Sequence, residues 1–305
     1  MHDFVIVLIN GADAPPLTAG RVHDLYFGLV PKIAQAGPET SIVWLAPGEA
    51  AELHLTVEAP VVAEAITDAI ATELAREPID QALLCAAGRR KRLLVADMES
   101  TMIAEECLDA LAAEAGIGAE VAAMTAKAMR GELDFDAALR NRVALLKGTP
   151  VARLEQLRDR LTPLPGAATL VATMRAHGAY TALVSGGFTF FSAAVATRLG
   201  FDSHFANELA VRDGKIEGSI TPPLLDRAAK AAHLRSLARA HGLTPADALA
   251  VGDGANDVDM VQIAGLGVAY RGKPLLAGAA DAVIRHADLT ALLYLQGYRR
   301  ADFVG

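Results

Sequence analysis

The sequence predicts an α/β protein with a parallel β-sheet covered by helices, preceded by a smaller domain of sheet and helix. Two observations lead to this prediction. Beyond about residue 92, short apolar runs alternate with helix-like segments, which is typical of parallel sheets with helices on both faces. The length of 305 residues also favours two domains. We expect these domains at residues 1–86 and 87–305.

The composition restricts the class of protein before any motif is considered. Apolar residues make up 52% of the chain, far more than in disordered proteins. The formal net charge is −8, and an acidic chain without a long basic block is a poor partner for nucleic acids or anionic membranes. The two cysteines, Cys85 and Cys107, are too few for a disulfide framework. We therefore expect a cytoplasmic protein that binds neither nucleic acid nor membrane.

The first 86 residues show strand and helix patterns in the order βαββαβ. Leu53, Leu55 and Val57, for example, alternate with more polar residues as in a half-exposed strand. We expect strands near residues 4–9, 41–45, 52–57 and 81–85 and helices near 17–36 and 61–76. This order is typical of the ferredoxin-like fold. No catalytic group stands out in this part of the chain.

The rest of the chain begins with a basic linker at residues 88–92, followed by a short apolar strand that ends before Asp97. Only helical patterns follow from Ile103 to about Leu161, so we expect a helical insert at about 104–163. The later elements are expected at 180–184 (strand), 188–199 (helix), 213–214 (hairpin turn), 226–241 (helix), 248–251 (strand) and near Val268 and Val283 (strands).

Residues 178–197 carry no formal charge and are long enough to span a bilayer. Ser185-Gly186-Gly187 interrupts this stretch, and hydroxyl side chains occur on both sides of it. We interpret the stretch as a buried strand, a turn and a helix.

Polar residues follow three of the predicted strands where each strand ends. Asp97 and Glu99 follow the first strand, Ser185-Gly186-Gly187 the second and residues 252–257 the third, while Lys230 lies in the intervening helix. Because ligands of open parallel sheets bind beyond the carboxyl ends of the strands, we expect all these groups to meet at one edge.

This combination of residue types predicts phosphoryl transfer. Clustered carboxylates repel one another unless a cation lies among them, and oxygen ligands suit Mg²⁺. A Ser-Gly-Gly turn at a helix start offers a hydroxyl and backbone N–H groups to an anion, and a lysine adds a point charge suited to phosphate. A carboxylate in such a site can act as the nucleophile.

Four motifs in this order resemble the haloacid dehalogenase superfamily of phosphatases. They are DMESTMI at residues 97–103, VSGGF at 184–188, Lys230, and GDGAND at 252–257. Their spacing fits the family over roughly residues 92–290. The resemblance implies a Rossmann-like core, and the insert matches the small helical cap that one branch carries between the first two motifs.

The resemblance also implies roles for the residues of the core. Asp97 is the expected nucleophile, which forms an aspartyl-phosphate, and Glu99 the expected acid that protonates the leaving oxygen and then activates water. Asp97, the main-chain carbonyl of Glu99, and Asp253 are expected to hold Mg²⁺. The expected contacts to the phosphoryl group and the substrate are Ser185, Gly186, Lys230 and Asn256, with Asp257 behind them. Glu99 departs from the family pattern, because Asp is usual there, and its arm is one methylene longer.

For the cap, the resemblance implies that Glu106 meets a substrate ammonium and Arg142 a substrate carboxylate. Met129 and Phe135 are expected to close the pocket. On their own, Glu106 and Arg142 are typical of a solvated helix surface, and Met129 and Phe135 of the core of the insert. This branch implies hydrolysis of O-phospho-L-serine to serine and phosphate, the last step of serine synthesis.

Two alternatives remain open. The chain could act on another small phosphate monoester, or pass the phosphoryl group to an acceptor alcohol. As a protein of another class, it could chiefly sense an amino acid, because the N-terminal βαββαβ pattern resembles small amino-acid-binding (ACT-like) regulatory domains. The intact catalytic motifs argue against a pure sensor. The N-terminal domain could also form a homodimer.

Overall fold

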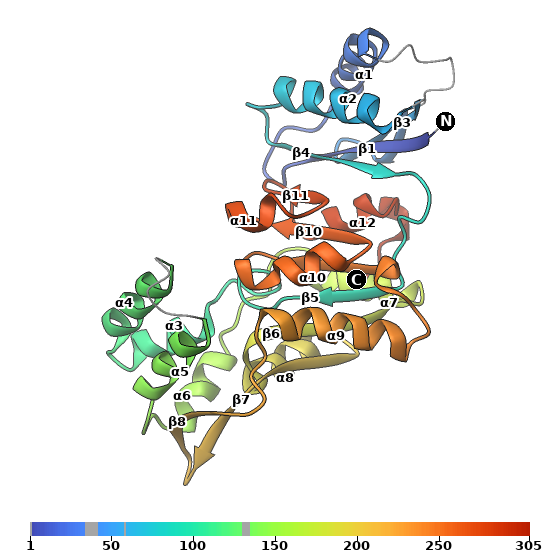
Figure 1. Ribbon diagram of the computed structural model, residues 1–305. Helices are drawn as coiled ribbons and strands as arrows, with labels where there is room; N and C mark the ends of the chain where they lie inside the picture. Colours follow the sequence, from blue (N-terminus) through green and yellow to red (C-terminus); the bar gives the residue numbers. More distant parts are fainter. Residues whose placement is uncertain (1, 34–41, 58, 130–134) are drawn as a thin grey trace.

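Two β-sheets, one after the other in the sequence, organise the chain (Figure 1). The computed structural model describes residues 2–33, 42–57, 59–129 and 135–305, without the side chains of 29–33, 125–129 and 135. In Figure 1 the N-terminal sheet lies at the top, the larger sheet in the middle, and helices α3–α6 form a group at the lower left.

The N-terminal sheet is antiparallel and has the strand order β2-β3-β1-β4. Its elements are β1 (His2–Asn10), α1 (Ala19–Ile33), β2 (Ile42–Ala46), β3 (Ala50–Val57), α2 (Pro60–Glu73) and β4 (Ile79–Cys85). The βαββαβ order is therefore confirmed. Successive residues of β1 face opposite sides of the sheet: Ile6 and Leu8 belong to the apolar core of this domain, whereas Val5 and Val7 belong to the core shared with the rest of the chain.

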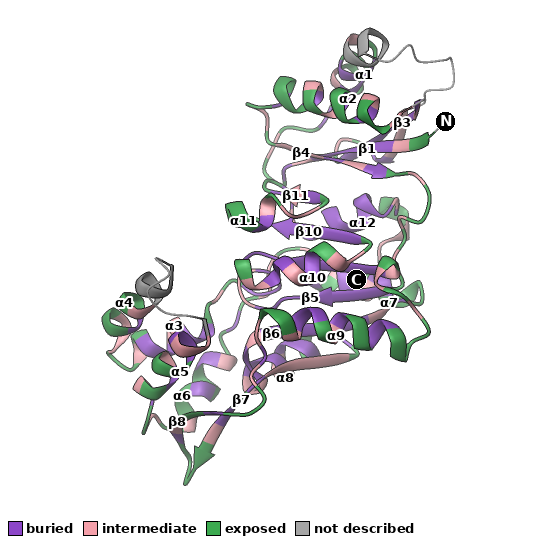
Figure 2. Cartoon of the chain, viewed as in Figure 1, coloured by how far each residue is buried: buried purple, intermediate pink, exposed green. Residues whose placement is uncertain are grey.

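The larger sheet has seven strands in the order β11-β10-β9-β5-β6-β7-β8. All neighbouring pairs are parallel except β7 and β8, which form an antiparallel hairpin. The strands are β5 (Leu93–Ala96), β6 (Tyr180–Phe188), β7 (Ser203–Arg212), β8 (Lys215–Thr221), β9 (Ala248–Gly252), β10 (Leu266–Tyr270) and β11 (Ala282–Ile284). The buried central strands appear purple in Figure 2, and β5 lies between β6 and β9. The predicted parallel-sheet class is confirmed.

Helices cover this sheet and form the insert. The insert contains α3 (Cys107–Glu114), α4 (Gly118–Met129), α5 (Phe135–Leu145) and α6 (Val151–Arg158). The other helices are α7 (Ala167–Ala176), α8 (Thr189–Leu199), α9 (Arg227–Ala240), α10 (Val258–Ile263), α11 (Pro274–Ala277) and α12 (Ala291–Leu295). The hairpin contacts the insert through backbone hydrogen bonds from Gly148 N to Ile216 O (2.8 Å) and from Val151 N to Gly214 O (2.9 Å).

The expected turn at Ser185-Gly186-Gly187 is wrong, because β6 continues through these residues to Phe188 and α8 begins at Thr189. The register explains the difference. Between two consecutive pairings, β6 advances from Val184 to Phe188 while β7 advances only from Phe205 to Asn207. Two extra residues therefore bulge out of β6, and a bulge redirects backbone groups without ending the strand.

One buried carboxylate joins the two sheets. Asp80, at the start of β4, is 3% exposed and accepts backbone N–H bonds from Arg285, His286 and Ala287 at 2.8, 3.0 and 2.9 Å. These three residues directly follow β11, so the edge of the larger sheet is fixed to the N-terminal domain. From Tyr180 onward, the uncharged stretch 178–197 forms β6 and then α8, so the expected strand and helix are confirmed. Among the described residues, no helix is long and apolar enough to cross a membrane.

Candidate active site

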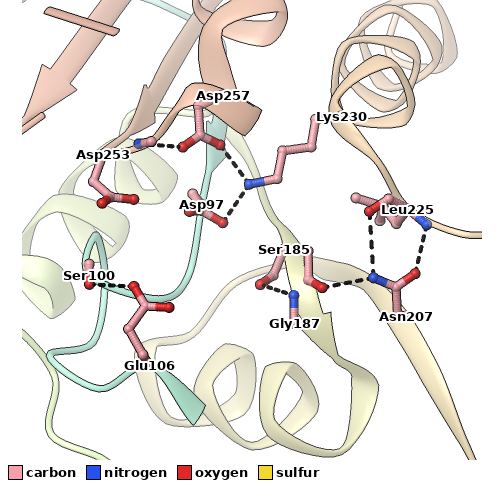
Figure 3. Close-up of polar contacts among 12 residues, drawn as sticks. Asp97, Ser100, Glu106, Ser185, Gly187, Asn207, Leu225, Lys230, Asp253 and Asp257 are labelled. Atoms are coloured by element: carbon pink, nitrogen blue, oxygen red, sulfur yellow. Dashed lines mark hydrogen bonds and ion pairs between the residues drawn. The ribbon is translucent and has the colours of Figure 1, made fainter. Parts of the chain in front are cut away.

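The centre of the candidate site is a buried lysine held between two carboxylates. Asp97 directly follows the central strand β5, and Lys230 extends from the first turn of α9, whose N-terminus is capped by Asp226. The Nζ atom of Lys230 lies 2.6 Å from one oxygen of Asp97 and 2.6 Å from one oxygen of Asp257. The three side chains point toward one another (Figure 3) and are at most 5% exposed.

The charges of this cluster do not balance. Burial raises the pKa of Asp97 well above its usual range, and the nearby charge of Asp257 raises it further, while Lys230 lowers it. Burial lowers the pKa of Lys230, but the two carboxylates outweigh this effect and keep the ammonium charged. Burial also raises the pKa of Asp253. The carboxyl groups of Asp97, Asp253 and Asp257 therefore outnumber the buried ammonium of Lys230.

A divalent cation fits this donor set. One oxygen each of Asp97, Asp253 and Asp257 lies within 4.8 Å of the other two, and carboxylate oxygens are the ligands that Mg²⁺ prefers. Asp257 is already engaged at both oxygens, by Lys230 and by the backbone N–H of Gly254 at 3.1 Å. Asp97 and Asp253, in contrast, border the pocket described below.

Glycine at position 252 allows this crowding. A Cβ atom on Gly252 would lie 2.3 Å from Cγ of Asp257, closer than two carbon atoms can approach. The last residue of β9 must therefore lack a side chain for Asp257 to reach Lys230. This steric requirement accounts for the glycine at the start of the fourth motif.

Ser185 and Glu99 both approach the backbone of Gly187 where a side chain would otherwise lie. Ser185 is 1% exposed, and its Oγ accepts a hydrogen bond from the backbone N–H of Gly187 at 3.0 Å. A Cβ atom on Gly187 would lie 3.0 Å from Oε1 of Glu99 and 3.2 Å from Ser185 Oγ. A glycine therefore lets both side chains approach this backbone.

Glu99 has the properties of an acid and base that works near neutral pH. Its Oε1 accepts a hydrogen bond from the backbone N–H of Cys107, the first residue of α3, at 3.0 Å. Burial raises the pKa of Glu99 to about 7, and the charge of Glu106 contributes to the rise. A carboxyl group with this pKa can both donate and accept a proton at physiological pH.

The cap contributes two charged side chains, one held by the first motif and one by another cap helix. Glu106 accepts a hydrogen bond from the hydroxyl of Ser100 at 2.8 Å, and Ser100 has a left-handed backbone conformation (φ 54°). Arg142 on α5 forms an ion pair of 2.6 Å with Asp109 on α3. In the part of the chain that the structure describes, the Nε atom of Arg142 is buried without a hydrogen-bond partner.

A pocket of about 360 Å³ joins the two regions. Of the residues predicted for the site, it is lined by Asp97, Glu99, Glu106, Arg142, Ser185, Gly186, Asp253 and Asn256. Lys230 and Asp257 are predicted site residues that lie beneath the lining and contact Asp97 or one another. The side chains of Met129 and Phe135 lie outside the described part of the chain.

Sequence reasoning missed several residues of this site. Lys273 follows β10 at a strand end and pairs with Asp253 at 3.2 Å, so the strand-end rule could have found it. Asp109 lies three residues after Glu106, a spacing that places two side chains on one helix face. Asn207 donates to the carbonyl of Gly186 at 2.8 Å, and no signal in the sequence pointed to it.

A carboxylate at the end of the central parallel strand, a buried lysine, an acidic cluster and a helical cap define a hydrolase of the haloacid dehalogenase type. The family model of haloacid dehalogenase-like hydrolases matches residues 94–262, more than half of the chain. The chain belongs to the haloacid dehalogenase-like hydrolases.

Three similar proteins extend this comparison. A phosphoserine phosphatase of Streptomyces coelicolor is 42% identical over 241 residues, which are 78% of this chain and 59% of the relative. A structure described as a phospho-aspartyl intermediate analogue of phosphoserine phosphatase is 40% identical, with a TM-score of 0.63, and the match covers 67% of this chain and 98% of that one. A haloacid dehalogenase family hydrolase of Salmonella enterica is 29% identical, with a TM-score of 0.82 over 96% of this chain and 98% of that one. The chain thus spans about three fifths of the Streptomyces relative.

Proposed function

We propose that this chain is a phosphoserine phosphatase, which hydrolyses O-phospho-L-serine to L-serine and phosphate in the last step of serine synthesis. The observation that carries the proposal is the position of Asp97. Its carboxylate lies 2.6 Å from Lys230 in a pocket that also holds a carboxylate and a guanidinium from the cap, Glu106 and Arg142. The names of two similar proteins support the choice of substrate.

In the first step, an oxygen of Asp97 attacks phosphorus, and the bond from phosphorus to the serine oxygen breaks. The leaving oxygen takes the proton of Glu99, whose pKa of about 7 leaves a large protonated fraction at neutral pH. The phosphoryl group is now covalently bound to Asp97. The hydroxyl of Ser185, the backbone at Gly186 and the ammonium of Lys230 stabilise the phosphoryl oxygens.

In the second step, Glu99 is a carboxylate and accepts a proton from water. The water oxygen attacks phosphorus, and the bond between phosphorus and Asp97 breaks. Phosphate leaves, Asp97 is again a carboxylate, and Glu99 is again protonated. One residue thus serves as acid and then as base, as its pKa near 7 permits.

Asp97, Asp253 and the main-chain carbonyl of Glu99 are the groups that would hold a divalent cation, and we propose Mg²⁺ because all these donors are oxygens. The ion supplies positive charge against the phosphoryl oxygens. Asp257 holds Lys230 at 2.6 Å and so positions its charge.

The cap residues would recognise the amino-acid part of the substrate. A zwitterion needs one fixed anion and one fixed cation, and Arg can bind a carboxylate through two N–H groups. We propose that Glu106 binds the substrate ammonium, Arg142 the substrate carboxylate, and Asn256 a further substrate group. Met129 and Phe135 remain predicted closing residues of the pocket.

We also propose the organisation predicted from the sequence: an N-terminal domain at 1–86, a phosphatase domain at 87–305 and a cap at about 104–163. A cytoplasmic location and a homodimer formed through the N-terminal domain belong to the same proposal. Sedimentation of the full chain measures its mass, and a monomer at micromolar concentration would contradict the dimer. Serine added to the assay tests whether the enzyme is regulated by an amino acid.

Phosphate release from a substrate panel tests the function directly. The panel contains O-phospho-L-serine, O-phospho-L-threonine and phosphate monoesters that lack either the ammonium or the carboxylate. We expect the highest kcat/KM for phosphoserine, activity with Mg²⁺, and none after EDTA. Equal kcat/KM across the panel would contradict the substrate assignment, and release of a phosphorylated alcohol on addition of an acceptor would identify a phosphotransferase instead.

A structure with beryllium trifluoride, which mimics a phosphoryl group, tests the nucleophile. We expect the beryllium atom on a carboxylate oxygen of Asp97. Beryllium on any other group would overturn the proposed chemistry.

A further inference from the structure

The bulge in β6 leaves a backbone carbonyl at the site without its usual partner. Regular pairing between β6 and β7 is interrupted between Val184 and Phe188, so Gly186 lies outside the paired residues of these two strands. Gly186 is half-buried, and a carbonyl that is shielded from water is costly without another hydrogen-bond partner. The group that satisfies it must therefore come from outside the ladder.

The side-chain amide of Asn207 fills this position. Its Nδ2 donates to the carbonyl of Gly186 at 2.8 Å, and its Oδ1 accepts from the backbone N–H of Leu225 at 2.7 Å. The same Nδ2 lies 3.5 Å from the carbonyl of Leu225. Asn207 is 1% exposed, and Figure 3 shows its amide between these two segments.

This contact fixes a peptide group that faces the pocket. The C=O of Gly186 and the N–H of Gly187 belong to one planar trans peptide, so they point in opposite directions. The C=O is held by Asn207, and the N–H donates to Ser185 Oγ at 3.0 Å. Because that N–H occupies a lone pair of the Ser185 hydroxyl, the hydroxyl proton is left to donate to an anion.

The other end of the amide reaches the helix that carries the lysine. Leu225 immediately precedes Asp226, which caps α9 by accepting the N–H of Ala229 at 2.7 Å. Lys230 follows in the first turn of that helix. One buried amide therefore ties the segment that carries Ser185, which lines the pocket, to the start of the helix whose lysine contacts Asp97 from beneath that lining.

We infer that Asn207 is a positioning residue for the phosphoryl group: its amide holds the Gly186–Gly187 peptide and the start of α9 in the relative position that phosphate binding requires. The inference rests on the proposed phosphatase function and deepens it. It concerns the phosphoryl group and not the alcohol, so it applies equally to every phosphate monoester that the enzyme accepts.

Asn207→Asp tests the inference, because aspartate keeps the acceptor for Leu225 and loses the donor to Gly186. The matched control is Asp202→Asn. Asp202 also links β6 to the start of β7, through the N–H and hydroxyl of Thr181 at 2.9 Å each, but at the opposite end of these strands. The control therefore weakens the same strand pair without touching the site.

We expect Asn207→Asp to lower kcat/KM about 100-fold, because misplaced phosphoryl-binding donors cost on this order. The loss should be equal for phosphoserine and for p-nitrophenyl phosphate, and the inhibition constant of inorganic phosphate should rise at least tenfold. Asp202→Asn should change each value less than threefold. A merely structural role would lower the fraction of active enzyme and leave KM and the phosphate constant unchanged, which would overturn the inference.

A measurement on the unmodified protein keeps the inference testable if the variant does not fold. In ¹H–¹⁵N spectra, a titration with inorganic phosphate should shift the Gly187 amide and the Asn207 side-chain amide together, and leave Thr181 unmoved. An Asn207 amide that does not respond would overturn the inference. If the wild type hydrolyses other phosphate esters but not phosphoserine, the proposed substrate fails, while the phosphate and p-nitrophenyl phosphate measurements still test Asn207.

Discussion

The core and the cap hold their charged side chains in different ways. In the core, Asp97, Lys230 and Asp257 are almost fully buried, and the lysine lies 2.6 Å from each carboxylate. In the cap, Glu106 is exposed and contacts a hydroxyl, while Arg142 is paired with Asp109, whose side chain is 46% exposed. The comparison indicates that the groups we propose to react are fixed in advance, whereas the groups we propose for recognition have partners that a substrate could replace.

The energies of these contacts differ for the same reason. Breaking a buried ion pair by removing one partner costs about 3–5 kcal/mol, because a charge is left unpaired away from water. An exposed pair contributes at most about 1 kcal/mol. Mutations in the core should therefore reduce both rate and stability, whereas mutations in the cap should change substrate affinity.

The largest effect is expected for Asp97→Asn. An amide cannot form the phosphoryl intermediate, so we expect kcat to fall by about 10⁴-fold or more, on the order seen for lost nucleophiles. Circular dichroism should show an unchanged fold, because asparagine has the same shape and can still accept a hydrogen bond from Lys230. Turnover within tenfold of the wild type would contradict a nucleophilic role for Asp97.

Lys230→Met should have the next largest effect, because it leaves Asp97 and Asp257 buried without their cation. We expect the free energy of unfolding to fall by about 3–5 kcal/mol and kcat to fall about 10³-fold. Denaturant titration and steady-state kinetics measure the two quantities. Arg235→Met, an exposed position on the same helix, is the control and should change neither by a measurable amount.

Glu99→Gln should lower kcat about 10²- to 10³-fold, since general acid–base catalysis contributes on this order. In the wild type, burial raises the pKa of Glu99 to about 7, so above pH 7 the protonated form declines and formation of the phosphoenzyme slows. Below pH 7 the carboxylate declines and hydrolysis of the phosphoenzyme slows.

Rapid-quench kinetics between pH 6 and 8 separate these two steps. The variant should lose the pH dependence of phosphoenzyme formation. With p-nitrophenyl phosphate, whose leaving group needs little protonation, the loss in that step should be much smaller than with phosphoserine. An equal loss with both substrates would contradict an acid role for Glu99.

The carboxylates of the core site could be predicted from the sequence because they lie at or just after the ends of strands. Asp97 and Asp253 each follow an apolar run, and the carboxyl ends of parallel strands meet at one edge. Lys230 was identified through the motif order, and the structure places it against Asp97. The family and the fold class predicted from these motifs are confirmed.

The bulge and the cap partners were not predictable in the same way. The backbone of Ser185-Gly186-Gly187 depends on a hydrogen bond from the side chain of Asn207, which is distant in the sequence. The local pattern therefore indicated a turn where the strand continues. Likewise, the contact of Arg142 with Asp109 depends on where the fold places α5 relative to α3. Such contacts between elements leave no signal in the spacing of either element alone.

Arg142→Ala tests the recognition role of the cap. A charged hydrogen bond contributes about 1.5–3 kcal/mol, so we expect KM for phosphoserine to rise about 10- to 150-fold while kcat changes little. KM for a phosphate ester without a carboxylate should stay within about threefold. Arg140→Ala, an exposed position on the same helix, is the matched control, and equal effects on both substrates would remove Arg142 from carboxylate recognition.

Asp109→Asn should have the smallest effect and tests the comparison most directly. Its pair with Arg142 is 2.6 Å long but 46% exposed on the aspartate side, so its loss should cost no more than about 1 kcal/mol. We expect KM for phosphoserine to rise about two- to fivefold, because the guanidinium loses the partner that orients it, with kcat and stability unchanged. The same substrates and denaturant titrations used for Arg142→Ala measure this. A loss of stability as large as that of Lys230→Met would show that the cap pair is as rigid as the core contacts. The distinction between fixed contacts in the core and replaceable contacts in the cap would then be wrong.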